Sequence, residues 1–180
     1  MLCIRTFCFL AAVSALALLG FQSHGNAQNA QIERGKYLVT LGSCTDCHTP
    51  GYFFGKPDMS RHLGGSEVGF ELPGLGVFYG PNLTPDKATG LGNWTDAQIV
   101  AAIRTGKRPD GRELAPIMPY HAFAALTDPD VQAIVAFLRG IKPVNNKVPG
   151  PFGPSEKPTS FVMQVVPAEN FKPTPLPDKK

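Results

Sequence analysis

The sequence predicts an all-α fold, in which a few short helices are joined by long irregular loops. Glycine and proline are both abundant, with 19 and 18 residues in a chain of 180, and this proline content is about twice the usual 5%. Apolar residues recur at helical spacing in three short stretches, near residues 30–41, after Thr95 and after Thr127. A short extended piece near Gly76–Tyr79 is compatible with the sequence, but a large sheet is not expected.

The first predicted helix covers about residues 30–41. Gly35 lies inside it and costs helix stability unless it lets another helix approach closely. We therefore expect a helix-crossing point at Gly35. The apolar positions that suit one face of this helix are Ile32, Tyr37, Leu38 and Leu41.

The motif Cys44-Thr45-Asp46-Cys47-His48 follows this helix directly. A Cys-x-x-Cys-His run is typical of covalent haem attachment, in which both thiols add to the porphyrin and the histidine becomes an iron ligand. The spacing lets one helical turn present both sulfurs to the porphyrin edge. A zinc site would need two more soft ligands, and the other cysteines, Cys3 and Cys8, lie in a segment that we expect to be removed. A thioredoxin-like dithiol would need a βαβ context, which the neighbouring sequence does not show.

Residues 1–27 have the pattern of a signal peptide. Arg5 supplies a positive charge, residues 7–21 are apolar or small, and residues 25–27 offer a small-residue cleavage site. The apolar run is shorter than the roughly 20 residues that span a bilayer comfortably; a retained anchor is the alternative. Covalent haem attachment in bacteria occurs outside the inner membrane, so we expect a periplasmic protein with no integral membrane anchor after cleavage.

Residues 49–92 are rich in glycine and proline and show no sustained helical period. We expect an ordered Ω-type loop system that wraps one side of the haem. The alternative is a disordered insert, against which the aromatic content argues. The aromatic residues are Tyr52, Phe53, Phe54, Phe70, Phe78 and Tyr79.

Two further helices are marked by their capping residues. Thr95 and Gln98 form a capping-box pattern, Trp94 is placed to pack on Ile99, and Gly106 is placed to end the helix. The apolar face of this helix comprises Ile99, Val100 and Ile103.

The last helix begins after Thr127, with acids and a proline in its first turn. Gly140 is placed to end it. After Lys142 the chain is proline-rich, and we expect a non-helical tail. Val131, Ile134, Val135, Phe137 and Leu138 form the predicted core face of the helix, and Phe152, Phe161, Val162 and Val165 are expected to hold parts of the tail.

Met118 is the expected sixth ligand of the iron. Pro116 and Pro119 flank it and keep the segment open, so its side chain can point at a metal instead of joining a helix. The alternative is an ordinary core methionine. The other candidates considered are Met59, His62, His121 and Met163.

Removal of residues 1–27 would take away Arg5 and lower the formal net charge from +3 to +2, and two haem propionates would bring it near neutral. This balance argues against a nucleic-acid partner, which would need a clustered basic face. A smaller basic cluster near Met118 suits either a docking patch around an exposed haem edge or a solvated turn. It comprises Arg104, Lys107, Arg108 and Arg112.

The order of these elements resembles the class I c-type cytochromes over about residues 30–142. The stretches Gly80–Asp86, Thr89–Asp96 and Leu114–Tyr120 resemble haem domains of the cytochrome c subunits of periplasmic alcohol- and gluconate-type dehydrogenases. Those subunits usually carry three haem motifs and a membrane-binding tail, whereas this chain has one motif and no such tail. The resemblance implies a cytochrome c fold around one covalently attached haem c, with thioether links from Cys44 and Cys47 and an axial pair formed by His48 and Met118.

We therefore expect a signal peptide at residues 1–27, a cytochrome c domain at 28–142 and a proline-rich extension at 143–180. The expected function is that of a monohaem electron carrier, not itself an enzyme, between a dehydrogenase or quinol-linked donor and an oxidase or other cytochrome. Two alternatives remain open: a five-coordinate haem enzyme or gas sensor, and a fixed cytochrome subunit of a dehydrogenase complex.

Overall fold

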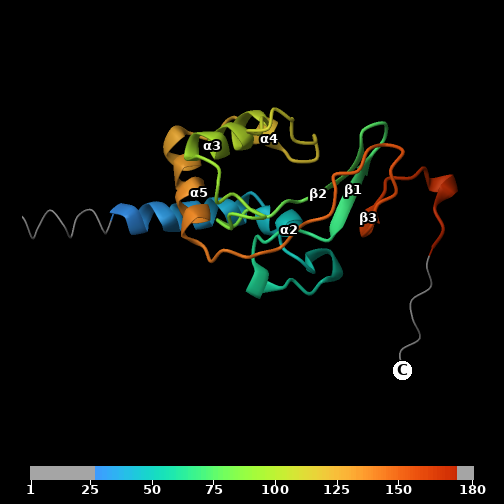
Figure 1. Cartoon of the computed structure of the whole chain (residues 1–180), viewed down its shortest axis with the longest axis horizontal. Helices are drawn as coiled ribbons and strands as arrows, with labels where there is room; N and C mark the ends of the chain where they lie inside the picture. Colours follow the sequence, from blue (N-terminus) through green and yellow to red (C-terminus); the bar gives the residue numbers. More distant parts are fainter. Residues whose placement is uncertain (1–26, 174–180) are drawn as a thin grey trace, which may run out of the picture.

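The computed structural model describes residues 27–173, so the predicted signal peptide lies almost entirely outside the described residues. A helix that is described over residues 27–41 leads, after a turn at Gly42 and Ser43, into the short helix α2. In Figure 1 the N-terminal helix is crossed by α5 (Asp128–Gly140). The helices α3 (Asp96–Thr105) and α4 (Tyr120–Phe123) lie on the other side of α2 from the 3-10 helices η1 (Tyr52–Phe54) and η2 (Met59–Arg61). The labelled helices are α2 (Cys44–His48), α3 (Asp96–Thr105), α4 (Tyr120–Phe123) and α5 (Asp128–Gly140).

The caps of α3 and α5 confirm the predicted starting points of both helices. The Thr95 hydroxyl accepts a hydrogen bond from the Gln98 backbone N–H, and the Gln98 side chain accepts one from the Thr95 backbone N–H, which completes a capping box. At the start of α5, the Thr127 hydroxyl accepts a hydrogen bond from the Asp130 N–H. Gly106 follows α3 with a φ of 69°, the left-handed conformation that favours glycine.

The core forms where α5 crosses the N-terminal helix at Gly35, as predicted. A Cβ atom at Gly35 would lie 1.9 Å from the Ala133 carbonyl oxygen and 2.8 Å from the Phe137 Cβ. The predicted face of α5 is buried throughout, but two residues of the apolar face predicted for the first helix are not: Tyr37 is 55% exposed and Leu41 is 67% exposed. The buried cluster comprises Leu38, Val39, Leu63, Leu91, Ile99, Ala133, Ile134, Val135, Phe137 and Leu138.

A small sheet corrects the all-α prediction. Strand β1 (Val68–Leu72) pairs antiparallel with β2 (Gly76–Tyr79), where the sequence allowed an extended piece, and parallel with β3 (Phe161–Met163). The strand order is β2-β1-β3. The third strand comes from the tail, about 90 residues after β1 in the chain, and such a long-range pairing leaves no local sequence signal.

The remaining part of the 49–92 segment forms turns and the 3-10 helices η1 (Tyr52–Phe54) and η2 (Met59–Arg61). The tail is non-helical as predicted, apart from the 3-10 turn η3 (Ala168–Asn170). Phe152 and Val162 are half-buried, but Phe161 is exposed and Val165 is 92% exposed, so Val165 does not hold the tail. Over residues 27–173, no helix has the length and apolar character needed to cross a membrane.

Candidate functional site

The motif helix α2 places both cysteines on one side of a single helical turn. Ser43 precedes it with a φ of 53°, which separates α2 from the N-terminal helix and lets the chain change direction. Cys44 and Cys47 are three residues apart, the spacing at which side chains of a helix are neighbours. Both thiols are half-buried and neither forms a disulfide.

Burial disfavours the ionised form of both thiols. Desolvation raises the pKa of Cys44 to about 11 and also raises the pKa of Cys47. Reactive dithiols of the thioredoxin type instead have a lowered thiol pKa, and α2 follows a helix, not a strand. The arrangement therefore does not favour a redox dithiol.

His48 is held in one orientation by a backbone carbonyl. Its side chain is 4% exposed, and its Nδ1 lies 2.7 Å from the Pro81 carbonyl oxygen. Because a carbonyl only accepts hydrogen bonds, Nδ1 must carry the proton and donate. Burial lowers the pKa of His48, so the imidazole is neutral at pH 7. Among the described residues its ring forms a hydrogen bond through Nδ1 alone, so Nε2 presents a lone pair to any metal beside it.

Gly80 brings the Pro81 carbonyl close enough to reach His48. A Cβ atom at Gly80 would lie 1.7 Å from the Cys47 carbonyl oxygen, so the loop touches the backbone of α2. Two backbone hydrogen bonds hold this contact in place: Gly65 N–H donates to the His48 carbonyl at 2.8 Å, and Ser66 N–H donates to the Gly80 carbonyl at 2.9 Å. Sequence reasoning missed this loop contact.

Met118 lies in a tight turn between α3 and α4. Its N–H donates to the Ala115 carbonyl at 2.9 Å, and the Tyr120 N–H donates to the Met118 carbonyl at 2.8 Å. The side chain is half-buried. Met118 therefore comes from the α3–α4 side of the molecule and His48 from α2 (Figure 1); their pairing across an iron atom stays a prediction.

The other candidate ligands lie in different places. Met59, His121 and Met163 are exposed, whereas His62 is half-buried and its Nε2 lies 3.0 Å from the Thr45 hydroxyl. His62 thus contacts Thr45, one of the two residues between the cysteines, on a side of α2 that sequence reasoning did not identify. No spacing pattern in the sequence marks this contact.

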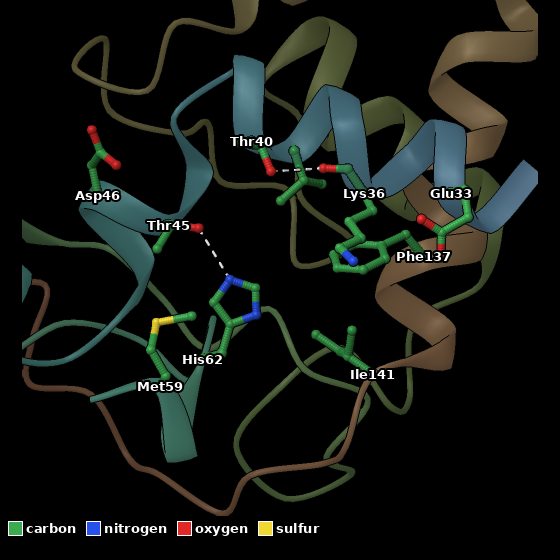
Figure 2. Close-up of a pocket in the computed structure, with 10 residues that line it drawn as sticks. Glu33, Lys36, Thr40, Thr45, Asp46, Met59, His62, Phe137 and Ile141 are labelled. Atoms are coloured by element: carbon green, nitrogen blue, oxygen red, sulfur yellow. Dashed lines mark hydrogen bonds between the residues drawn. The ribbon is translucent and has the colours of Figure 1, made fainter. Parts of the chain in front are cut away.

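His62 borders a hollow beside the motif helix (Figure 2). The volume of this hollow is about 710 Å³. Neither cysteine of the motif, nor His48 or Met118, lines it. This hollow is therefore separate from the predicted haem ligands. Its lining residues are Glu33, Lys36, Val39, Thr40, Thr45, Asp46, Met59, His62, Phe137 and Ile141.

The donor set at α2 fits a covalently attached haem. It provides two unpaired protonated thiols one helical turn apart and a neutral imidazole whose Nδ1 is already engaged. In the described part of the chain, no three His, Cys, Asp or Glu side chains are grouped to hold a metal ion.

The basic cluster near Met118 is largely paired with aspartates. Lys107 is exposed, whereas the three arginines each form an ion pair. This pairing weakens the docking interpretation and favours the solvated turn. The pairs are Arg104–Asp128 at 2.7 Å, Arg108–Asp110 at 3.3 Å and Arg112–Asp110 at 2.9 Å.

Comparison with known proteins agrees with this site. Residues 32–142 match the family described as Cytochrome c. The chain is 39% identical over 143 residues to the cytochrome c subunit of alcohol dehydrogenase (quinone) from Gluconobacter oxydans, covering 77% of this chain and 28% of that protein. It is 35% identical over 145 residues to the fructose dehydrogenase cytochrome subunit from Gluconobacter japonicus, covering 80% of this chain and 28% of that protein.

A third relative, a diheme cytochrome c-type protein from Cereibacter sphaeroides, is 30% identical over 118 residues. The match covers 63% of this chain and 37% of that protein. The chain thus spans only 28 to 37% of the length of these relatives. The family match covers more than half of the chain and contains the whole Cys-x-x-Cys-His motif. The protein therefore belongs to the cytochrome c family of electron-transfer proteins, whose members carry covalently bound haem c.

Proposed function

We propose that this protein is a periplasmic monohaem c-type cytochrome that transfers single electrons. Cys44 and Cys47 form the thioether links, and His48 and Met118 are the axial ligands. The observation that carries the proposal is the buried, neutral His48, which the Pro81 carbonyl orients with Nε2 unengaged, one residue after the second thiol. The single Cys-x-x-Cys-His motif supports one haem.

When bound, the haem supplies a one-electron Fe(III)/Fe(II) couple. The imidazole of His48 and the thioether of Met118 would be the two protein ligands of the iron, and with both bound the iron would have no free position for oxygen or peroxide. The thioether, as a soft ligand, favours ferrous iron more than a second imidazole does. The two cysteines fix the porphyrin to α2, so the group stays in place through repeated redox cycles.

The donor is a periplasmic dehydrogenase or a quinol-linked complex, and the acceptor is an oxidase or another cytochrome. Support comes from the relatives, which are cytochrome subunits of alcohol and fructose dehydrogenases. The predicted signal peptide supports export to the periplasm, where such a donor and the haem-attachment machinery are found.

Replacing Met118 with alanine tests the axial pair. We expect the ferric protein to lose the weak absorption band at the red end of the visible spectrum, and the reduced protein to bind carbon monoxide. The midpoint potential should fall by about 0.1 V or more, within the roughly 0.8 V range that axial ligands set. Visible spectroscopy and redox titration of the holoprotein measure these effects.

Met59→Ala and Met163→Ala are the matched controls, because both side chains are exposed, and both variants should keep the wild-type spectrum. Rapid carbon monoxide binding by the wild-type protein would contradict the axial pair and favour the five-coordinate enzyme or sensor.

A fixed subunit of a dehydrogenase complex is the second candidate. Large apolar side chains of the tail are exposed, among them Phe161, Val165 and Phe171, and exposed apolar groups of this kind are typical of protein interfaces. Sizing of the protein purified from its own host distinguishes the two: a free carrier elutes as a single small protein, and a fixed subunit elutes with its dehydrogenase.

A further inference from the structure

The chain that follows α5 returns to the loop that carries Pro81. Val144 and Asn146 form hydrogen bonds to Asn82, Thr84, Thr89 and Gly64, which precede them by 57 to 82 residues. We call residues 144–146 the return segment. It begins just beyond residue 142, where the family match ends. These contacts therefore join a segment outside the matched family region to loops inside it.

Asn82 directly follows Pro81 and is fully engaged. Its side chain is 2% exposed, and its Oδ1 accepts hydrogen bonds from the N–H and the hydroxyl of Thr84 at 2.9 and 2.7 Å. Its Nδ2 donates to the Thr89 hydroxyl oxygen at 3.0 Å and to the Val144 carbonyl at 2.7 Å. A buried amide whose two N–H groups and two oxygen lone pairs all form hydrogen bonds is held in a single orientation. Because the Pro81 carbonyl belongs to the peptide bond between Pro81 and Asn82, this orientation also fixes the position of that carbonyl.

Thr84 and Thr89 connect Asn82 to the return segment. The Thr84 hydroxyl is fully buried and accepts a hydrogen bond from the Val144 N–H at 3.0 Å. The Thr89 hydroxyl accepts one from the Asn146 N–H at 3.0 Å while it donates to Asp86 at 2.8 Å. Each hydroxyl thus joins the Asn82 amide to the backbone of the return segment.

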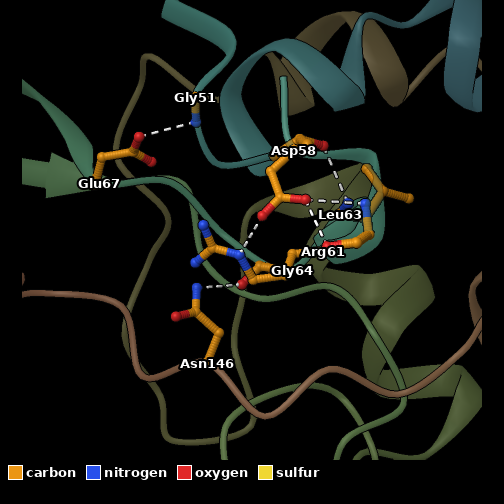
Figure 3. Close-up of polar contacts among 9 residues, drawn as sticks. Gly51, Asp58, Arg61, Leu63, Gly64, Glu67 and Asn146 are labelled. Carbon is orange, nitrogen blue, oxygen red and sulfur yellow. Dashed lines mark hydrogen bonds and ion pairs between the residues drawn. The ribbon is translucent and has the colours of Figure 1, made fainter. Parts of the chain in front are cut away.

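A second connection reaches α2 from the other side. Figure 3 shows the Asn146 side chain donating to the Gly64 carbonyl at 2.8 Å. The next residue, Gly65, donates its N–H to the His48 carbonyl at 2.8 Å. The return segment therefore contacts both loops that hold His48. One loop carries Gly65, which bonds to the backbone carbonyl of His48, and the other carries Pro81, which bonds to the imidazole of His48.

We propose that the return segment, through the hydroxyls of Thr84 and Thr89 and the amide of Asn82, positions the Pro81 carbonyl on His48 and so sets the electron donation of this axial ligand. The inference rests on the proposed function, since it takes His48 as the iron ligand. A hydrogen bond from Nδ1 to a carbonyl raises the basicity of a ligating imidazole. A more basic imidazole stabilises ferric iron, so a loosened Pro81 carbonyl raises the midpoint potential.

Thr84→Val tests this proposal, because valine keeps the shape of threonine and removes its hydroxyl. We expect the ferric-to-ferrous equilibrium to move about threefold or more toward the ferrous form, which is about 28 mV for a one-electron couple. The His48 ring N–H resonance of the ferrous protein should shift and exchange faster with solvent. Thr84→Ser keeps the hydroxyl and should restore both values. Thr89→Val provides the same test at the second hydroxyl if Thr84→Val does not fold.

Ser160→Ala is the control, since it removes a hydrogen bond from the tail to the Glu67 carbonyl (2.7 Å) without touching the Asn82 cluster. It should leave the potential and the ring N–H resonance unchanged. If Thr84→Val and Thr89→Val lower stability but change neither value, the hydroxyls are only structural and the inference is wrong, while the proposed function stands. If the wild-type protein is found to carry no covalently held haem, both this inference and the proposed function are wrong.

Discussion

Replacing Gly80 with alanine is expected to destabilise the folded holoprotein by about 3 kcal/mol or more and to break the hydrogen bond between His48 and Pro81. The new Cβ atom would lie 1.7 Å from the Cys47 carbonyl oxygen and 2.7 Å from the Cys47 carbonyl carbon. Both atoms belong to the backbone of α2 and cannot rotate away, so the loop must move. Chemical denaturation and the His48 ring N–H resonance measure the two effects.

Gly153→Ala is the matched control for this variant. Gly153 also lies in a loop, and a Cβ atom there would meet nothing closer than the Glu156 side chain at 3.5 Å. We expect a change in unfolding free energy within about 0.5 kcal/mol. If Gly80→Ala were as stable as Gly153→Ala, with an unchanged ring N–H signal, the close approach of the loop to α2 would be incorrect.

Replacing Gly35 with alanine is expected to lower the free energy of unfolding by about 3 kcal/mol, although alanine is the better helix former by about 1 kcal/mol. A Cβ atom at Gly35 would lie 1.9 Å from the Ala133 carbonyl oxygen. The crossing of the N-terminal helix over α5 would have to open, and the buried cluster around Phe137 would lose contacts. Thermal and chemical denaturation of the holoprotein measure the loss.

Gly140→Ala separates this steric effect from helix propensity. Gly140 is the last residue of α5, and the nearest atom to a Cβ there is the Ile32 Cδ1 at 4.0 Å. This variant should be neutral or slightly stabilised. A stabilised Gly35→Ala protein would mean that the two helices do not cross at this residue.

The sequence was most informative where structure depends on neighbouring residues. The capping residues Thr95 and Thr127 determine the starts of α3 and α5 through hydrogen bonds to the next turn, so both starts were predictable. Gly35 indicated a helix crossing because a glycine inside a helix needs a packing reason. The family match confirmed the cytochrome c assignment that the Cys-x-x-Cys-His motif and the element order had suggested.

The features that escaped prediction depend on residues far apart in the chain. The pairing of β1 with β3 is one example, and the contact of the return segment with Asn82 is another. Neither produces a local period or cap, since each partner is an ordinary loop or strand residue by itself. The apolar face predicted for the first helix is only partly buried for a related reason. Tyr37 and Leu41 fit an apolar face, but α5 packs against the side that carries Gly35, Leu38 and Val39.

The mass of the mature protein tests the central claim most directly. The protein is expressed with a haem-attachment system, denatured and measured by mass spectrometry. We predict the mass of the processed polypeptide plus one haem, with the pigment retained through acid–acetone extraction and lost in the double variant Cys44→Ala, Cys47→Ala. A wild-type mass equal to that of the bare processed polypeptide, or a pigment that acid–acetone removes, would contradict the account.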